Sequence, residues 1–217
     1  MRTCPRCGAV VRPPGLWSSS WTCSLHGSVI PVHPAVPATP EGVARLAAEV
    51  TVPLWLPWPL PDGWLVSGLR WAGDDAHGVV ASVLAVSGPN PLPEAEDERG
   101  ADLLLIGEQP GVGLGAHLAG LQDIDAGATL REQAEWEPAH VKITAAGHDT
   151  PMWSVPVDGG VGYVGEASGV WLWLLAWPAP AAAVLLERFA LVDLRDPGHP
   201  LDPPCGALTP RLSREVP

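Results

Sequence analysis

Residues 139–177 read AHVKITAAGHDTPMWSVPVDGGVGYVGEASGVWLWLLAW. Short apolar runs alternate here with turn residues such as Gly159-Gly160, a pattern that is typical of strands. The connections are too short to contain crossover helices, so consecutive strands are expected to pair antiparallel. The stretch predicts four strands, at 139–146, 151–156, 161–166 and 170–177. A mainly antiparallel sheet is therefore the centre of the expected fold.

The flanking sequence extends this sheet and adds helices. Similar short apolar runs predict strands at 64–72, 78–87 and 102–108. Thr39 as a cap followed by Pro40 predicts a short amphipathic helix that ends near Val50. Weaker helical spacing is present at 114–121, and a stronger pattern predicts a helix over 180–192. The fold class is therefore α+β, a mainly antiparallel sheet with a C-terminal helix.

Three other segments lack a regular pattern. The segment 52–64 contains four prolines, which exclude a helix interior or a central strand, so we expect an extended, tryptophan-rich segment lying across the core surface. Residues 94–98 and 122–138 are acidic and polar and are expected to form exposed loops. The tail from Pro197 is rich in proline and is expected to be loosely ordered.

The first thirty residues carry the clearest site. Cys4-Pro-Arg-Cys7-Gly8 and Trp21-Thr-Cys23-Ser-Leu-His26-Gly27 are two zinc knuckles, separated by fifteen residues. In each, two ligands flank a tight turn and a glycine relieves the backbone. We predict one structural Zn²⁺ held by Cys4, Cys7, Cys23 and His26, with no position left for a catalytic water. The alternative is a set of unbound, reduced cysteines.

This site divides the chain into three parts. Residues 1–38 are predicted to be a zinc-ribbon-like module with a proline-rich linker, 39–196 the α+β domain, and 197–217 the tail. Residues 1–40 contain three arginines and no carboxylate, which leaves a formal charge of −15 on the remainder. That charge excludes generic nucleic-acid or anionic-membrane binding by the main body.

Composition also bounds the location of the protein. No apolar run precedes the first cysteines, so no signal peptide is expected, and we predict a cytoplasmic protein. The apolar run 170–186 is interrupted by Pro178 and Pro180 and is shorter than the ~20 residues needed to cross a bilayer. We expect no membrane span there, but a buried strand followed by a buried helix.

Several further motifs have a structural and a functional interpretation. Gly111-Val-Gly113-Leu-Gly115 fits poorly to a dinucleotide fingerprint and is interpreted as a turn entering a short helix, with phosphate binding as the alternative. Two polar clusters lie at predicted turns or strand ends, where local hydrogen bonding is the simpler explanation than catalysis; they are Asp74, Asp75 and His77, and His140, His148 and Asp149. Cys205 has no evident base beside it and is interpreted as an unreactive free thiol.

Trp171, Trp173 and Trp177 share parity on one predicted strand and are expected on one face. That face is interpreted as core packing, with an apolar groove or a partner interface as the alternatives.

The motifs together resemble a known family. The resemblance rests on the two knuckles, on 14–27, on Trp55-Leu-Pro-Trp-Pro-Leu-Pro61, on Gly111–Gly115 and on Asp193-Leu-Arg-Asp196. The chain is similar to an uncharacterised family of actinobacterial proteins, a domain of unknown function. Members have carried a phosphotransacetylase label, for which this chain shows no motif. A second, architectural similarity, in Pro61–Trp64 and the tryptophan strand, is to concave half-barrel domains of the lipoprotein-carrier type.

The leading hypothesis is a non-catalytic, zinc-binding cytoplasmic protein that acts as a binding or regulatory module for a protein partner. The first alternative is an enzyme for acyl or phosphoryl transfer or hydrolysis, with the Gly111–Gly115 turn as a cradle and His117, His140 or His148 as base. The second is apolar-ligand binding on a tryptophan-lined concave sheet. The oligomeric state is left open.

Overall fold

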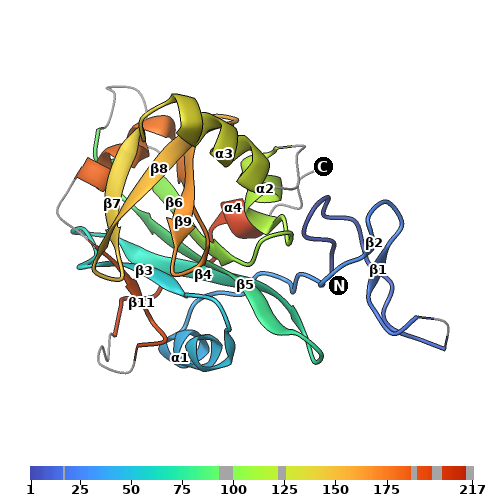
Figure 1. The fold of residues 1–217 in the computed structure, drawn as a ribbon. Helices are drawn as coiled ribbons and strands as arrows, with labels where there is room; N and C mark the ends of the chain where they lie inside the picture. The colour runs from blue at the N-terminus through green and yellow to red at the C-terminus, as the bar shows by residue number, and fades with distance from the viewer. Residues whose placement is uncertain (17, 93–99, 122–125, 187–189, 197–201, 214–217) are drawn as a thin grey trace.

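The computed structural model describes residues 1–16, 18–92, 100–121, 126–186, 190–196 and 202–213. Within these residues the body is a nine-stranded sheet in the order β3-β11-β7-β8-β9-β10-β6-β5-β4 (Figure 1). Its strands are β3 (Trp55–Trp58), β4 (Leu65–Asp74), β5 (Gly78–Gly88), β6 (Ala101–Glu108), β7 (Val141–Ala145), β8 (His148–Val157), β9 (Gly160–Ala167), β10 (Val170–Trp177) and β11 (Ala190–Asp193). Neighbouring strands pair antiparallel except β11 and β7, which are parallel. The prediction of a mainly antiparallel sheet is confirmed, and the seven predicted strands are β4 to β10.

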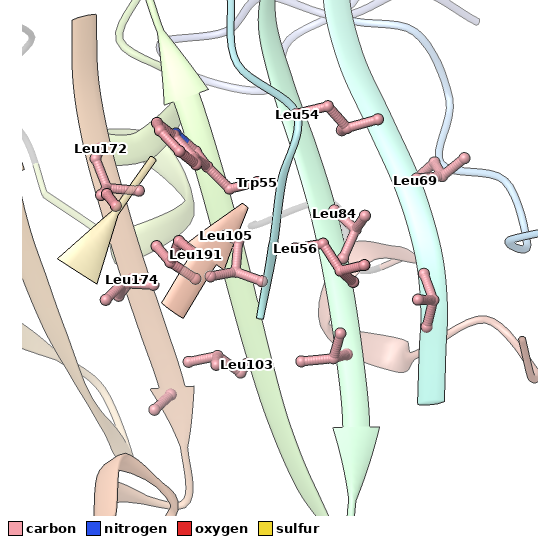
Figure 2. Close-up of a cluster of buried hydrophobic side chains, with 14 of the residues drawn as sticks. Leu54, Trp55, Leu56, Leu69, Leu84, Leu103, Leu105, Leu172, Leu174 and Leu191 are labelled. Atoms are coloured by element: carbon pink, nitrogen blue, oxygen red, sulfur yellow. The ribbon is translucent and has the colours of Figure 1, made fainter. Parts of the chain in front are cut away.

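Strand β3 makes the sheet curl. It pairs with β11 at one edge, yet the segment before it lies against β5, because the Ser82 hydroxyl donates to the Pro53 carbonyl oxygen at 2.7 Å. A Cβ atom on Gly107 of β6 would lie 2.6 Å from the same oxygen, so only glycine permits this approach. Figure 2 shows Leu54, Trp55 and Leu56 among the leucines of the sheet. The segment is extended as predicted, but its predicted place on the core surface is wrong, because Trp55 and Leu56 are fully buried.

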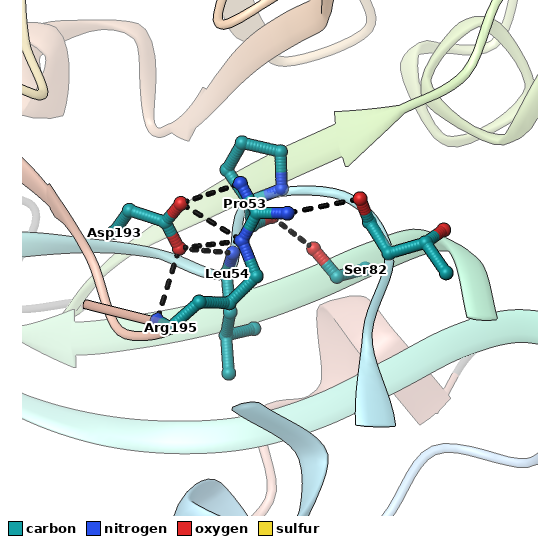
Figure 3. A network of polar contacts seen from close by, with 6 residues as sticks. Pro53, Leu54, Ser82, Asp193 and Arg195 are labelled. Atoms are coloured by element: carbon teal, nitrogen blue, oxygen red, sulfur yellow. Dashed lines mark hydrogen bonds and ion pairs between the residues drawn. The ribbon is translucent and has the colours of Figure 1, made fainter. Parts of the chain in front are cut away.

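A second network fixes the path of this segment, and Figure 3 shows it. The Asp193 carboxylate accepts hydrogen bonds from the Leu54 N–H at 3.2 Å and from the Arg195 guanidinium at 2.7 Å. Arg195 in turn donates to the Thr51 carbonyl oxygen at 2.9 Å. The Asp193–Asp196 motif is thus a clamp between the end of β11 and the start of β3.

The sheet has an inner and an outer face, set by the period-two alternation of its strands. Even-numbered residues of β10, such as Leu172 and Leu174, join β3 on the inner face. Odd-numbered residues, such as Trp173 and Leu175, join α2 (Leu114–Ala119) on the outer face. Both faces are therefore buried, which explains the high apolar content of these strands.

Helices follow the predictions in part. Helix α1 (Pro40–Glu49) has the predicted Thr39 cap, whose hydroxyl accepts from the Gly42 N–H at 3.0 Å. The predicted helix near 114–121 is α2. The predicted loop at 122–138 is wrong for α3 (Ala126–Trp136), where alanine, leucine, glutamate and glutamine favour a helix in spite of the polar composition. Residues 122–125 and the whole of the predicted loop at 94–98 lie outside the described residues.

The predicted helix over 180–192 is confirmed only at its start, as a 3₁₀ helix, and is wrong for 190–192; residues 187–189 lie outside the described residues. The chain forms a 3₁₀ helix, η1 (Ala179–Leu186), and then β11, in which Leu191 is fully buried between β3 and β7. Residues with this apolar spacing form a strand here because β3 and β7 both supply backbone hydrogen-bond partners. Near the C-terminus the described helix is only the four-residue α4 (Pro210–Ser213).

Two segments outside the sheet cover the edge strand β4. The linker is extended as predicted, and its Val36 exchanges backbone hydrogen bonds with Leu69 at 2.9 Å in both directions. Tail residues 202–213 are not loosely ordered: the Val66 N–H donates to the Pro204 carbonyl oxygen at 2.8 Å, and Thr209 is buried. An exposed strand edge is a site of unwanted pairing, and these segments protect it. No described helix has the length and apolar character required to cross a bilayer.

Candidate metal centre

The first knuckle holds Cys4 and Cys7 on one tight turn. The Cys4 carbonyl oxygen accepts from the Gly8 N–H at 2.9 Å, and Gly8 has φ of +69°, a conformation that glycine adopts without strain. Backbone hydrogen bonds from Arg6 and Cys7 reach the Cys4 sulfur. Such bonds orient the sulfur and stabilise a thiolate.

The second knuckle repeats this arrangement around Cys23 and His26. Backbone hydrogen bonds from Leu25 and His26 reach the Cys23 sulfur, and Gly27 has φ of +67°. The turn joins β1 (Thr22–Cys23) to β2 (Gly27–Ser28), which form a two-stranded hairpin. The strand pair thus fixes the second half of the site.

The structure brings the four predicted ligands together. Their ligand atoms all lie within 4.8 Å of one another, an arrangement that could hold a metal ion. The Cys7 and Cys23 sulfurs are 3.7 Å apart, and the His26 Nδ1 lies 3.6 Å from the Cys4 sulfur and 3.7 Å from the Cys23 sulfur. A tetrahedral ion at about 2.3 Å from sulfur and about 2.0 Å from nitrogen requires edges of about 3.5 to 3.8 Å. All three cysteines are free thiols, so no disulfide competes for them.

The surroundings of the two buried thiols differ. Burial raises the pKa of Cys4 to about 12, against the opposing effect of its backbone hydrogen bonds. At Cys23 burial also raises the pKa, but the backbone hydrogen bonds from Leu25 and His26 and the His26 and Cys4 side chains outweigh it and lower the pKa to about 6. A cation in the centre would favour the thiolate form of all three cysteines and the neutral form of His26, because metal ligands bind deprotonated.

The chain belongs to DUF6758. This family of unknown function matches residues 1–212, so the resemblance to an uncharacterised family is confirmed. No curated protein and no solved structure matches the chain. The match includes both knuckles, and it carries no activity with it.

The glycine-rich turn of this DUF6758 chain donates hydrogen bonds to a carboxyl group from its own sequence. Glu108, at the end of β6, is 2% exposed, and its carboxylate accepts from the N–H groups of Leu114 at 2.7 Å and Gly115 at 3.2 Å. Burial raises the pKa of Glu108 to about 7, although these hydrogen bonds lower it. The donors that a phosphate would need are therefore in use.

The glycines themselves have structural roles. Gly111 and Gly113 both have φ of +87°, and a Cβ atom on Gly115 would lie 2.4 Å from the Trp173 ring. The turn thus reverses the chain and lets α2 pack directly on β10. The interpretation as a turn entering a short helix is confirmed.

The predicted polar clusters remain local. His77 lies 2.8 Å from the Asp74 carboxylate within the β4–β5 turn. His140, just before the start of β7, lies 2.9 Å from the Ser154 hydroxyl oxygen. Its Nδ1 also accepts a hydrogen bond from the Ser154 N–H of β8. His148 and Asp149 are exposed at the β7–β8 turn. Within the described residues, no hydrogen bond or ion pair joins any of these histidines to the glycine-rich turn.

The tryptophans of β10 share a face, as predicted, but that face is packed. Trp173 is 1% exposed and Trp177 is 5% exposed, and both belong to the outer cluster with α2. The inner face is filled by β3. An open tryptophan-lined groove on a concave sheet is therefore wrong for Trp173 and Trp177.

Sequence reasoning missed two residues that organise the site. Glu108 was not recognised, although a single acidic residue between an apolar strand and a glycine-rich turn was a usable signal. The sequence identifies Arg6 only as one of three arginines in residues 1–40, yet its Nη2 donates to the Gly111 carbonyl oxygen at 2.6 Å and joins the knuckle to the body. No local sequence pattern predicts a contact between residues so distant in sequence.

Proposed function

We propose that residues 1–30 bind one structural Zn²⁺ and that the protein acts as a cytoplasmic binding or regulatory module, not as an enzyme. The observation that carries the proposal is the set of four donors that lie within 4.8 Å of one another, with three of their six separations at 3.6 to 3.7 Å. Three sulfurs and one imidazole nitrogen are the donors that zinc prefers in structural sites, and four protein ligands leave no open position. Free, closely spaced thiols also suit a reducing compartment.

The structural role is supported by the small size of the module core. In the described residues it consists of Cys4, Val11, Cys23 and Val29, so two of its four buried members are ligands themselves. So few apolar contacts do not offset the cost of ordering thirty residues. The metal takes the place of a core.

A binding role is supported by what the other motifs do. The glycine-rich turn, which the enzyme hypothesis needs as a phosphate or acyl cradle, has its Leu114 and Gly115 donors on Glu108. The module meanwhile presents Leu16, which is 98% exposed, and Leu25, which is 76% exposed. Single exposed apolar side chains are common on protein surfaces, so contact of Leu16 and Leu25 with a partner is part of the proposal and is tested below.

Metal analysis of the purified full-length chain tests the zinc site. We expect one equivalent of zinc in the native chain and in Cys205→Ser, a control that removes the one cysteine outside the cluster, and none in Cys23→Ser. Replacement by Co²⁺ should give the visible bands of tetrahedral thiolate coordination, unchanged by added azide, because no position is open. Absence of stoichiometric metal, or an azide-sensitive cobalt spectrum, would remove the structural assignment.

Co-purification from native cells tests the binding role. Leu25→Asp should reduce recovery of a specific partner, whereas Leu92→Asp, a change at a 57% exposed leucine on the body, should not. Equal recovery with both variants would argue against the module as the contact surface.

A further inference from the structure

The metal module and the body enclose a cleft of about 260 Å³. The module contributes Pro5 and Arg6 of the first knuckle and 28–30 after the second. The body contributes Asp74 and His77 of the β4–β5 turn and 109–112 of the glycine-rich turn. Figure 1 shows the module beside the end of the body that carries these turns. The volume lies near the lower end, about 300 Å³, of pockets that bind small molecules.

The two walls are held in place by backbone and side-chain contacts. Thr3 and Val32 exchange backbone hydrogen bonds at 2.8 and 3.0 Å, and the Gly73 N–H donates to the Pro31 carbonyl oxygen at 3.0 Å. Arg6 crosses from the module to Gly111 at 2.6 Å. The cleft is therefore a preformed space between fixed elements.

The charged groups of the cleft favour an anion. Its lining contains one carboxylate, Asp74, whose Oδ1 accepts from the N–H groups of Ala76 at 3.1 Å and His77 at 2.9 Å and lies 2.8 Å from the His77 ring. That charge is already compensated by local donors. The Arg6 guanidinium, in contrast, donates to Gly111 through Nη2, and its Nε is buried without a partner among the described residues. Nη1 and the second N–H of Nη2 are left for a bidentate contact with a carboxylate or a phosphate.

The remaining lining groups suit a hydroxyl group on the same ligand. With Nδ1–H of His77 donated to Asp74, the neutral imidazole presents Nε2 as an acceptor. The Gln109 amide lines the same wall. We propose that this cleft binds a small hydroxylated organic anion, with Arg6 on the anionic group and His77 on a hydroxyl.

The test is an amide NMR titration of the metal-loaded full chain with glycerol 3-phosphate and with glycerate, which separate a phosphate from a carboxylate as the anionic group. We expect saturable shifts of the Gly111 and Val112 amides with at least one of the two. Arg6→Gln should weaken binding about tenfold or more, because it removes charged hydrogen bonds. Arg12→Gln, a change at an exposed arginine of the same module outside the cleft, should leave the affinity unchanged.

A second pair of variants acts from the other wall and does not touch the knuckle. His77→Asn should weaken binding severalfold, whereas His148→Asn, at an exposed turn, should have no effect. Metal content and amide dispersion report separately whether each variant keeps its fold. The proposal fails if neither anion gives saturable shifts, or if either control weakens binding as much as its partner, and neither result bears on whether the module holds zinc.

Discussion

The metal module and the curled sheet differ in the interactions that stabilise their folds. The body is held by two buried clusters, one on each face of the sheet, with Trp55 and Trp173 among the largest fully buried side chains. The apolar core cluster of the module has four buried residues in the part of the chain that is described, and two of them are cysteines. One region is stabilised by burial of apolar surface, and the proposed function assigns coordination as the stabilising interaction of the other. Their stabilities should therefore respond to different perturbations.

Removal of the metal should produce the largest effect, and only in the module. Structural zinc contributes about 10 kcal/mol or more to the folding of small zinc domains. In the chelated protein or in Cys23→Ser, we expect amide signals of residues 1–30 to collapse to unfolded positions while those of β5, β6 and β10 keep their dispersion. Cys205→Ser should behave as the native chain does. A metal-free module that kept its dispersed signals would show that coordination is not what folds it.

Truncation of a side chain in the inner core should destabilise the body and leave the module unchanged. Trp55→Ala removes a fully buried ring between β3 and the sheet and should lower the free energy of unfolding of the body by about 3 to 5 kcal/mol. Urea denaturation followed by tryptophan fluorescence measures this, and a chromophoric chelator reports metal release in the same samples. Trp136→Ala, at a side chain that is 81% exposed, should change stability by less than about 0.5 kcal/mol.

If the two regions are independent, Trp55→Ala shifts the fluorescence transition and leaves the metal-release transition in place. A common shift of both transitions would show instead that the contacts at Thr3 and Arg6 couple the module to the body strongly.

The same difference explains which parts of the structure could be predicted. Metal ligands lie close together in sequence and their spacing is dictated by coordination, so the cluster of Cys4, Cys7, Cys23 and His26 could be predicted directly. Strands β4 to β10 were also predictable, because alternation and turn residues are local signals. These features need no knowledge of distant contacts.

The errors occurred where distant contacts decide the outcome. The segment 190–193 forms a strand because β3, more than 130 residues earlier, supplies its partner, and its apolar spacing alone fits a helix equally well. Prolines in 52–64 correctly excluded a central strand, but they could not reveal that the segment crosses the inside of the sheet. Glu108 escaped notice because its function as an internal hydrogen-bond acceptor depends on the α2 backbone.

Glu108 gives the smallest predicted effect and a distinct one, since here the body itself contains a buried titratable group. Its pKa of about 7 is above the ordinary 4.5, so between these values the folded state holds a proton that the unfolded state has lost. The unfolded state thus binds fewer protons, and the free energy of unfolding should fall as pH rises from about 4.5 to about 7, by at most about 3 kcal/mol.

Glu108→Gln should abolish this slope, whereas Glu166→Gln, at an exposed position of β9, should keep it. Urea denaturation at a series of pH values measures the difference, and the result separates two physical descriptions of the glycine-rich turn. If the slope persists in Glu108→Gln, the carboxylate is ionised throughout, and the α2 backbone compensates its burial in full. If the slope disappears, burial outweighs those hydrogen bonds, and the Glu108 carboxyl group stays protonated in the folded state up to a pH of about 7.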